Sequence, residues 1–196
     1  MPLRRQYEKI STEFADAGCP LQPDTGTGEG DSRVIHVIYD SCYLINGGVW
    51  PPAEVEAAFP DGVVHAVREL VPNRVQKEVQ RLLEMPGKEE VGRKAQERLS
   101  LLLQGPGGEA CDIDPFLDYQ PLRRKRGPNS SVDRAICGLA CALAAGHPDD
   151  LIFIATRDNG VVTEAEALVR RRELPVYTPT SMKAFIKRLK SDQAEP

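Results

Sequence analysis

The chain has 196 residues, of which 41% are hydrophobic and 28% are charged, and its formal net charge is −4. This composition is typical of a globular domain, and the acidic balance argues against a protein that coats duplex nucleic acid. No apolar run approaches the ~20 residues of a membrane span, and the N-terminal segment lacks the apolar core of a signal peptide. We therefore expect a cytoplasmic protein without a membrane segment, whose five scattered cysteines are reduced thiols.

The N-terminal segment differs in composition from the rest of the chain. Residues 4–17 fit a short amphipathic helix, and residues 18–33 have the polar, glycine- and proline-containing composition of a linker. We expect a folded domain at 33–190, preceded by an extension at 1–32 and followed by a polar tail at 191–196.

The most strongly patterned element is the run Val34–Tyr39, which is apolar almost throughout. Such a run is typical of a strand that is buried on both faces of a parallel sheet. It stops at Asp40, which is followed by Ser41, so the strand ends in a carboxylate beside a hydroxyl. In open α/β sheets this end of a strand borders the crevice in which ligands bind.

Helical and strand patterns alternate along the remainder of the chain. We expect, in order, a helix or tight turn at 42–46, a helix at 52–59, a strand at 62–70, helices at 73–84 and 89–103, a strand at 110–113, a helix from 130 or 131 to 146, a strand at 151–155, a helix at 163–172, a strand at 174–177 and a helix at 181–189. This alternation predicts an α/β fold with a mainly parallel sheet. Strands 34–39 and 151–155 are the most apolar and are expected to be central neighbours.

Four acidic residues are placed where this topology would bring them to one edge of the sheet. Asp40 and Asp158 follow the two most apolar strands, Asp133 lies in the first turn of a helix, and Glu78 lies about two turns into the helix after the second strand. Carboxylates gathered at one place repel each other, and a divalent cation relieves the repulsion. Mg²⁺ or Mn²⁺ suits this role because it takes oxygen ligands and is often held by a few carboxylates plus substrate phosphate. We expect Asp40, Asp133 and Asp158 to hold the metal, with Glu78 contributing directly or through water.

Each acid also has a purely structural interpretation. Asp40 could cap the following helix, Asp158 could form a turn, and Asp133 could interact with the helix dipole. We favour a catalytic role for these three because the fold would place them together. Glu78 could be a solvated helical residue, and Glu69 is the substitute candidate for it.

Polar residues beside the acids are candidate supporting groups. Ser41 and Thr156 are placed to hydrogen-bond the carboxylates and fix their orientation, and Asn159 is placed to contact a water or a phosphate. Asp112 and Asp114 are interpreted as ordinary loop acids.

A run of four basic residues precedes the helix that carries Asp133. It consists of Arg123, Arg124, Lys125 and Arg126. The run is equally compatible with a solvated surface and with a site that binds phosphates next to the acids. In the second case its affinity for nucleic acid would fall as salt rises.

In order and context, these pieces resemble the four acidic motifs of the PIN-domain nucleases. The matching pieces are Asp40–Ser41 after the first strand, Val71–Pro72 leading into Glu78, the helix start Ser131–Val132–Asp133–Arg134–Ala135–Ile136, and Thr156–Arg157–Asp158 after an apolar strand. The resemblance covers roughly residues 33–190. It implies a three-layer α/β/α sandwich and a metal-dependent nuclease site that usually acts on single-stranded RNA.

The resemblance implies an endoribonuclease that uses Mg²⁺ or Mn²⁺ to hydrolyse the phosphodiester bonds of single-stranded RNA. Family members of this kind are toxins paired with an antitoxin protein, or enzymes that process or degrade RNA, and a second copy of the chain is a further partner to consider. The chain departs from the family in three ways: Cys42 stands where small polar residues are common, the helix at 89–103 is interpreted as an insertion, and residues 1–33 form an extension.

Two other classes of function remain open. One is a non-catalytic relative that binds RNA or a protein. The other is a haloacid-dehalogenase-like phosphatase with Asp40 as nucleophile, although such enzymes place a second aspartate two residues later and this chain has Cys42 there. A dinucleotide-binding domain is not favoured, because no G-x-G-x-x-G motif follows the first strand.

Overall fold

The computed structural model describes residues 33–47 and 64–179, which contain a sheet of five strands. The strands are β1 (Arg33–Tyr39), β2 (Val64–Pro72), β3 (Gly108–Cys111), β4 (Leu151–Ala155) and β5 (Val176–Tyr177). They lie in the order β3-β2-β1-β4-β5, and each neighbouring pair is parallel. The predicted α/β fold with a parallel sheet is confirmed, and so is the prediction that β1 and β4 are neighbours.

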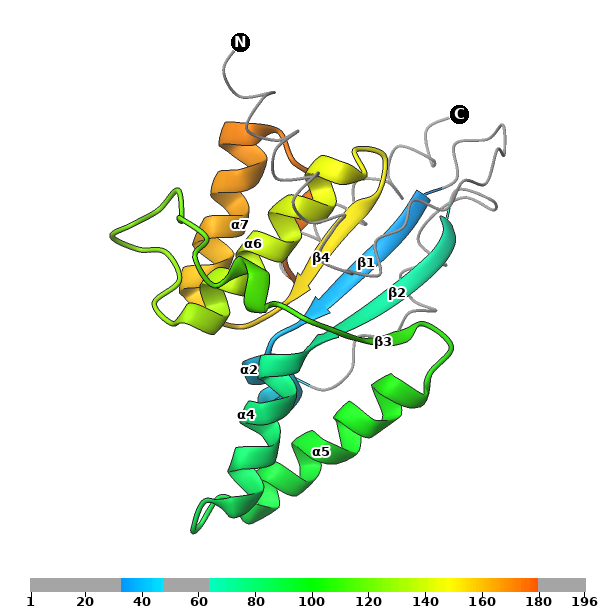
Figure 1. The fold of residues 1–196 in the computed structure, drawn as a ribbon, viewed down its shortest axis with the longest axis vertical. Helices are drawn as coiled ribbons and strands as arrows, with labels where there is room; N and C mark the ends of the chain where they lie inside the picture. Colours follow the sequence, from blue (N-terminus) through cyan, green and yellow to red (C-terminus); the bar gives the residue numbers. More distant parts are fainter. Residues whose placement is uncertain (1–32, 48–63, 180–196) are drawn as a thin grey trace, which may run out of the picture.

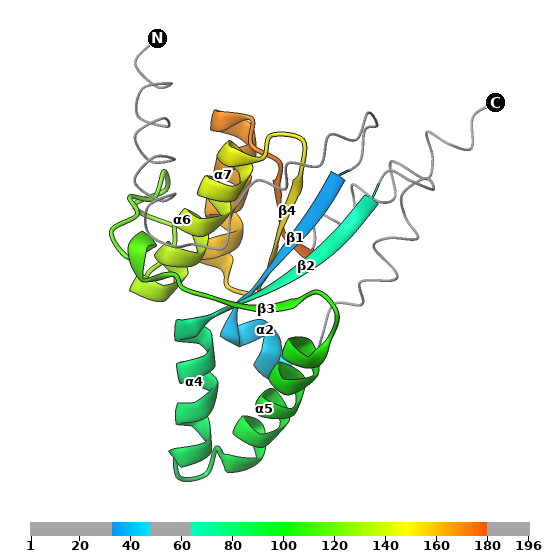
Figure 2. The same cartoon turned by 45° about the vertical axis from the view of Figure 1, so that its right-hand side comes forward.

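The helices form two groups around the sheet. They are α2 (Ser41–Asn46), α4 (Asn73–Glu84), α5 (Glu89–Gln104), α6 (Ser131–Gly146) and α7 (Asn159–Arg172), with a short 3-10 helix η1 (Asp114–Phe116). α6 and α7 pack on each other and against β4 and β5, whereas α2, α4 and α5 pack together beside β2 and β3 (Figures 1 and 2). This arrangement is consistent with a three-layer α/β/α sandwich. The α4–α5 hairpin extends beyond the carboxyl ends of the strands (Figure 1).

The core is centred on β1 and β4, as their apolar sequences predict. All five residues of β4 are buried, and the largest buried side chains include Tyr39 of β1 and Phe153 of β4. The buried stripe of α6 includes Ile136, Leu139 and Leu143. Because both faces of the central strands are covered, a polar group at their ends has few solvent contacts.

Several elements end at other residues than the sequence-based predictions gave, β2 among them, since it extends to Pro72 rather than ending at 70. Local chemistry explains two further cases. α7 begins at Asn159 rather than 163 because the Asp158 side chain accepts hydrogen bonds from the first-turn amides of Gly160 and Val161. β3 begins at Gly108 rather than 110. A Cβ atom on Gly108 would lie only 1.8 Å from the Leu102 carbonyl oxygen, so glycine alone permits this close passage of β3 under α5. β5 is limited to Val176–Tyr177.

Several predicted segments lie outside the described residues. They are the extension at 1–32, the helix at 52–59, the helix at 181–189 and the tail at 191–196. Within the described residues, no helix is long and apolar enough to cross a membrane.

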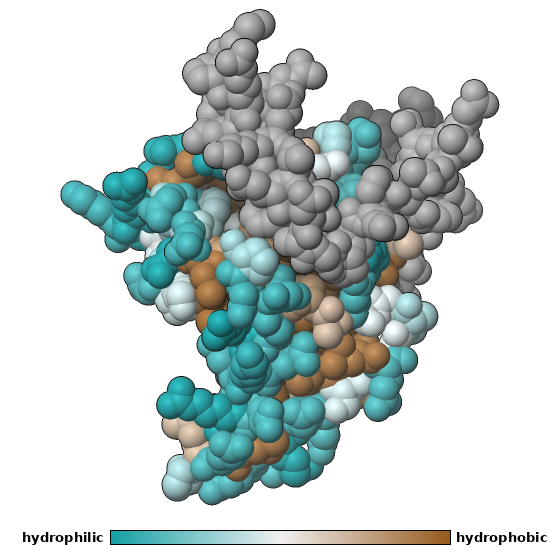
Figure 3. Space-filling view, viewed as in Figure 1, coloured by the Kyte–Doolittle hydropathy of each residue, from teal (hydrophilic) through white to brown (hydrophobic). Residues whose placement is uncertain are grey.

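The surface of the described part is mostly hydrophilic, with smaller hydrophobic patches around α4 and α5 (Figure 3). Four of the exposed large hydrophobic residues belong to the α4–α5 hairpin, namely Leu83, Met85, Val91 and Leu101. The edge of the sheet at which Asp40 follows β1 and Asp158 follows β4, called the acidic edge below, is a separate region. There Tyr39 pairs with Ala155, and the Asp40 amide continues this pairing by donating to the Ala155 carbonyl at 3.1 Å. The register therefore places Asp40 and Thr156 side by side.

Candidate active site

Asp40 is buried at the carboxyl end of the central strand, with 3% of its surface exposed. Its Oδ2 atom accepts hydrogen bonds from the Thr156 hydroxyl at 2.6 Å and from the Cys42 thiol at 2.9 Å. Among the described residues, the other oxygen, Oδ1, accepts a hydrogen bond only from the Ser41 hydroxyl, at 3.4 Å. Two donors on one oxygen compensate for its loss of water, and Oδ1 is left to receive a ligand. Asp40 stands at the N-cap position of α2, but its side chain makes no capping hydrogen bond, so capping does not account for the carboxylate.

Thr156 links the two central strands at this edge. Its hydroxyl donates to Asp40 and accepts a hydrogen bond from the Asp158 amide at 3.0 Å, and only 2% of the residue is exposed. One buried hydroxyl therefore fixes the position of the acid after β1 relative to the acid after β4. This geometry is what the sequence analysis expected of Thr156 as a supporting residue.

Cys42 is a second support for Asp40 that the sequence analysis did not identify. Burial, together with the negative charge of Asp40, raises the pKa of the Cys42 thiol to about 11. The thiol is therefore protonated at neutral pH and can donate to Asp40. It also accepts a hydrogen bond from the Arg157 amide at 3.1 Å, so it contacts the segment after β4 as well.

Asp158 both caps α7 and faces the acidic edge. Its Oδ1 atom accepts hydrogen bonds from the Gly160 amide at 2.7 Å and the Val161 amide at 3.0 Å. In the described part of the chain, no hydrogen bond to its Oδ2 atom is observed. Asp158 therefore has a structural role, as the cap of α7 rather than as a turn former, and this role occupies only one of its two carboxylate oxygens.

Asp133 has the same double character at the start of α6. It forms a capping box with Ser130, in which the Ser130 amide donates to Asp133 Oδ2 at 3.2 Å and the Asp133 amide donates to the Ser130 hydroxyl at 3.0 Å. Burial and the charges of Asp40 and Asp158 raise the pKa of Asp133, against the effect of the Ser130 hydrogen bonds. Asp133 therefore lies within electrostatic reach of both strand-terminal acids.

Glu78 belongs to the same group of acids although much of its side chain is exposed. Partial burial raises the pKa of Glu78, a hydrogen bond with Ser41 lowers it, and the charges of Asp40 and Asp133 raise it further. The other candidate, Glu69, is 5% exposed and accepts a hydrogen bond from the Tyr39 hydroxyl at 2.8 Å. Burial raises the pKa of Glu69, and none of the four acids contributes to that shift. Glu69 therefore has a buried partner of its own and is a weaker candidate than Glu78 for the group of acids.

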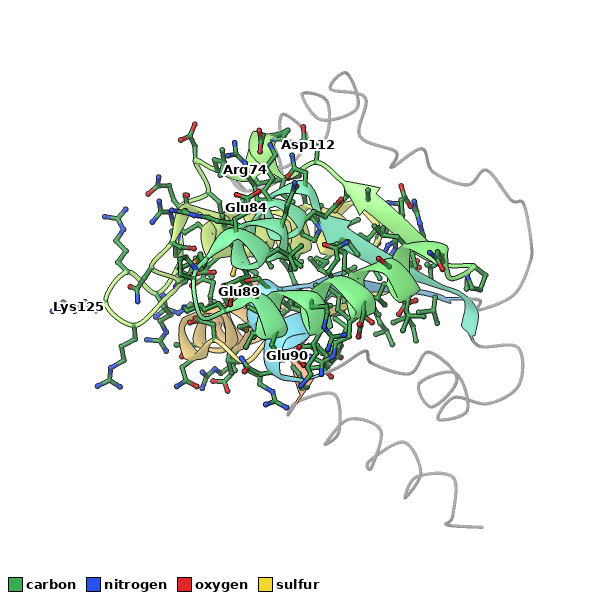
Figure 4. The ribbon with its side chains drawn as sticks, turned by 90° about the horizontal axis from the view of Figure 1, so that it is seen from below. Arg74, Glu84, Glu89, Glu90, Asp112 and Lys125 are labelled. Carbon is green, nitrogen blue, oxygen red and sulfur yellow. The ribbon has the colours of Figure 1, made fainter. Side chains whose placement is uncertain are left out.

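The loop that carries the basic run lies beside the acids where it reaches α7, and its exposed residues project away from them. A Cβ atom on Gly160 would lie 2.6 Å from the Gly127 carbonyl oxygen and 2.9 Å from Asp158 Oδ1. Gly127, the residue directly after the run, therefore packs against the start of α7. Arg124, Lys125 and Arg126 are exposed, and Lys125 extends far from the body of the protein (Figure 4).

The remaining polar residues at this edge have structural partners. Arg74 donates from Nε and Nη2 to the two oxygens of Asp114 at 2.6 and 2.9 Å, and Asn73 donates to Asp112 at 2.6 Å. Arg74 and Asp112 lie close together in Figure 4. These pairs tie the start of α4 to the segment after β3, which supports the interpretation of both aspartates as loop acids. Asn159 is exposed, and its backbone carbonyl accepts a hydrogen bond from Thr163.

The four acids fit a cation that keeps much of its water. In residues 33–47 and 64–179, no three Asp, Glu, His or Cys side chains are close enough together to surround a metal ion. The site nevertheless offers carboxylate oxygens on Asp40, Asp133, Asp158 and Glu78. Mg²⁺ is commonly bound by one or two carboxylates plus waters and substrate phosphates, so these donors suit Mg²⁺ or Mn²⁺ better than a metal enclosed entirely by protein ligands.

No protein-family model and no curated protein matches this chain.

Proposed function

We propose that this protein is a PIN-type endoribonuclease that depends on Mg²⁺ or Mn²⁺ and hydrolyses phosphodiester bonds in single-stranded RNA. The observation that carries the proposal is the buried Asp40, held by two donors on one oxygen, at the centre of four mutually repelling acids. In the described part of the chain, no ion pair joins any of these acids to a basic side chain. Uncompensated charge of this kind is typical of functional sites and favours a cation as the missing partner.

The chain's own residues divide the work of hydrolysis. When bound, the divalent ion would polarise the phosphate, make a water more acidic and stabilise the charge that develops on the leaving oxygen. One or two of Asp40 Oδ1, Asp133 and the free oxygen of Asp158 would hold it directly, and the remaining acids would reach it through water. Thr156 and Cys42 keep Asp40 in one orientation. Glu78, which is hydrogen-bonded to Ser41 and lies in the field of Asp40 and Asp133, is suited to bind a water of the ion and to accept its proton.

The basic run supports a nucleic-acid substrate. The whole chain has a net charge of −4, so any attraction for a polyanion must come from a local group of charges. Arg124, Lys125 and Arg126 form such a group in a loop whose base touches the start of α7, next to Asp158. A strand held there by its phosphates would lie beside the acids.

The phosphatase alternative has weaker support. A phosphatase of that kind needs an acid two residues after its nucleophile to exchange a proton with the leaving group. Here that residue is Cys42, whose thiol has its pKa raised to about 11 and donates a hydrogen bond to Asp40. It therefore takes the role of a structural donor.

The test is cleavage of a panel of single-stranded RNAs with Mn²⁺, with and without chelator, by the wild type and Asp40→Asn. The amide oxygen of Asn can still accept from Thr156 and Cys42, so the variant removes charge with little structural change. We expect a loss of at least about 100-fold in rate, comparable to other losses of transition-state charge stabilisation. Asp112→Asn, a loop acid tied to Asn73, is the matched control and should keep wild-type activity. Equal cleavage by wild type and Asp40→Asn, or no cleavage by the wild type, would contradict the proposal.

A further inference from the structure

Glu164 is a buried acid that takes no part in the group of four. It lies on α7 and is fully buried. Its Oε1 atom accepts hydrogen bonds from the Tyr119 hydroxyl at 2.9 Å and the Leu122 amide at 2.7 Å, and its Oε2 atom accepts from the Arg123 amide at 2.9 Å. A carboxylate is buried only where such donors replace water, so these bonds are strong and directional.

All three donors belong to the segment that leads into the basic run. Glu164 therefore fixes the start of that segment, including the backbone of Arg123 itself. The end of the run is fixed independently, because the Gly127 carbonyl is packed on Gly160. Both anchors are on α7, and the three exposed residues between them carry positive charge.

Arg123 supplies a separate observation that indicates a ligand. Its Nε atom is buried, and it has no hydrogen-bond partner in the described part of the chain. A buried donor without an acceptor is unusual in a native structure and calls for an explanation. Arginine donors match phosphate oxygens well, and Arg123 as a whole is only partly buried, so a phosphate becomes a suitable acceptor for this donor when the side chain turns outward.

We propose that Glu164 is a positioning residue for nucleic-acid binding, which holds the loop from Arg123 to Arg126 ready for the phosphates of a single strand. The loop is then ordered before the strand binds, so the entropy cost of ordering it does not reduce the binding free energy. The inference concerns binding, and it rests on the proposed function only in taking the bound strand to be the substrate.

The test is a double-mutant cycle on binding of a short fluorescent single-stranded RNA, measured by anisotropy in chelator over a range of salt concentrations. The four proteins are the wild type, Glu164→Gln, a loop variant and their combination. The loop variant carries Arg124→Gln, Lys125→Gln and Arg126→Gln together. We expect Glu164→Gln to weaken binding about 10-fold, equivalent to ~1.4 kcal/mol of lost binding free energy. The loop variant should reduce the salt slope by ~2, because each phosphate contact to a single strand contributes ~0.7.

The decisive comparison is Glu164→Gln in the loop variant, where it should change affinity less than about threefold because Arg123 is the one charge of the loop that it still positions. General damage to the fold would weaken binding in both backgrounds. Glu166→Gln removes the same charge from an exposed position on α7, where Glu166 pairs with Arg170, and should bind like the wild type. If Glu164→Gln does not fold, Tyr119→Phe removes one donor and leaves the two backbone bonds, and the same cycle should show a smaller loss of about 2–3-fold.

Wild-type affinity for Glu164→Gln, an equal loss in both backgrounds, or no RNA binding by the wild type would overturn the inference. Its failure is distinguishable from failure of the proposed function. Binding that depends on Glu164 without any cleavage leaves the inference standing and refutes the nuclease. Cleavage that requires Asp40, together with RNA binding that does not change in Glu164→Gln, supports the nuclease and refutes the inference.

Discussion

Replacing Thr156 by valine should destabilise the protein and impair the site at once. Valine has nearly the same shape but lacks the hydroxyl that donates to Asp40 at 2.6 Å and accepts from the Asp158 amide at 3.0 Å. Loss of a hydrogen bond to a charged group removes about 1.5–3 kcal/mol, and a buried amide left without an acceptor costs about 1–3 kcal/mol. The Cys42 thiol still donates to Asp40 and moderates the first of these losses. We expect the free energy of unfolding to fall by about 3 kcal/mol, which corresponds to a melting temperature lower by ~10 °C.

The assay is urea unfolding in chelator, followed by circular dichroism, with cleavage measured in parallel. Thr163→Val is the control, because the Thr163 hydroxyl makes one exposed hydrogen bond to the Asn159 carbonyl and its loss should cost under about 1 kcal/mol. In an Asp40→Asn background the effect of Thr156→Val should shrink by at least about 1 kcal/mol, because the charged acceptor is absent. Equal destabilisation by Thr156→Val and Thr163→Val would refute the idea that this hydroxyl holds the acids together.

Three further predictions follow from other parts of the molecule. Cys42→Ala should lower the cleavage rate about 10-fold through loss of one hydrogen bond to the carboxylate after β1, whereas Cys42→Ser keeps a donor and should stay within a few-fold of wild type; equal rates for the two variants would contradict the role of the thiol. Gly160→Ala would bring a Cβ atom to 2.6 Å from the Gly127 carbonyl oxygen, so it should destabilise the protein by about 1–3 kcal/mol and weaken RNA binding. No change in either quantity would show that the loop is not packed against the start of α7. Burial lowers the pKa of His36 despite its bond to an aspartate, so below the ordinary value of 6.5 the unfolded state binds more protons than the native state. The free energy of unfolding should therefore decrease as the pH is lowered below 6.5, by at most ~1.4 kcal/mol per pH unit. Urea titrations should show this slope in wild type and in His147→Gln and lose it in His36→Gln, and three identical slopes would contradict the assignment.

The sheet could be predicted because its determinants are local in the sequence. The apolar run of β1 and the apolar run of β4 each specify a doubly buried strand without reference to any other part of the chain. The position of Asp40 follows, since the end of a buried strand is visible as the end of the run. The start of α7 was missed by four residues because a side-chain cap, supplied by Asp158, takes precedence over the apolar stripe from which the helix was predicted.

The supports of the site could not be predicted in the same way, because they depend on contacts between distant residues. Cys42 lies 114 residues from Thr156, and Glu164 lies 45 residues from Tyr119. One signal for Glu164 was present in the sequence: it is a charged residue on the buried stripe of α7, next to Ala165 and between Val161 and Leu168. Such a residue needs buried partners, but the sequence does not tell which segment supplies them.

The structural and catalytic interpretations of the acids are compatible, because each carboxylate has two oxygens. Asp158 gives Oδ1 to the first turn of α7, and Asp133 gives Oδ2 to the capping box of α6. In both cases the second oxygen is left for another partner, and the positive ends of two helix dipoles point to the same edge of the sheet. Capping thus orients these acids and offsets part of their repulsion before any cation binds. Asp40 differs, because it stands at the N-cap position of α2 without a side-chain capping bond, and its closest donors are the side chains of Thr156 and Cys42. The covered faces of the central strands account for its burial but not for a carboxylate at this buried position, and this makes Asp40 the residue whose presence most requires a function.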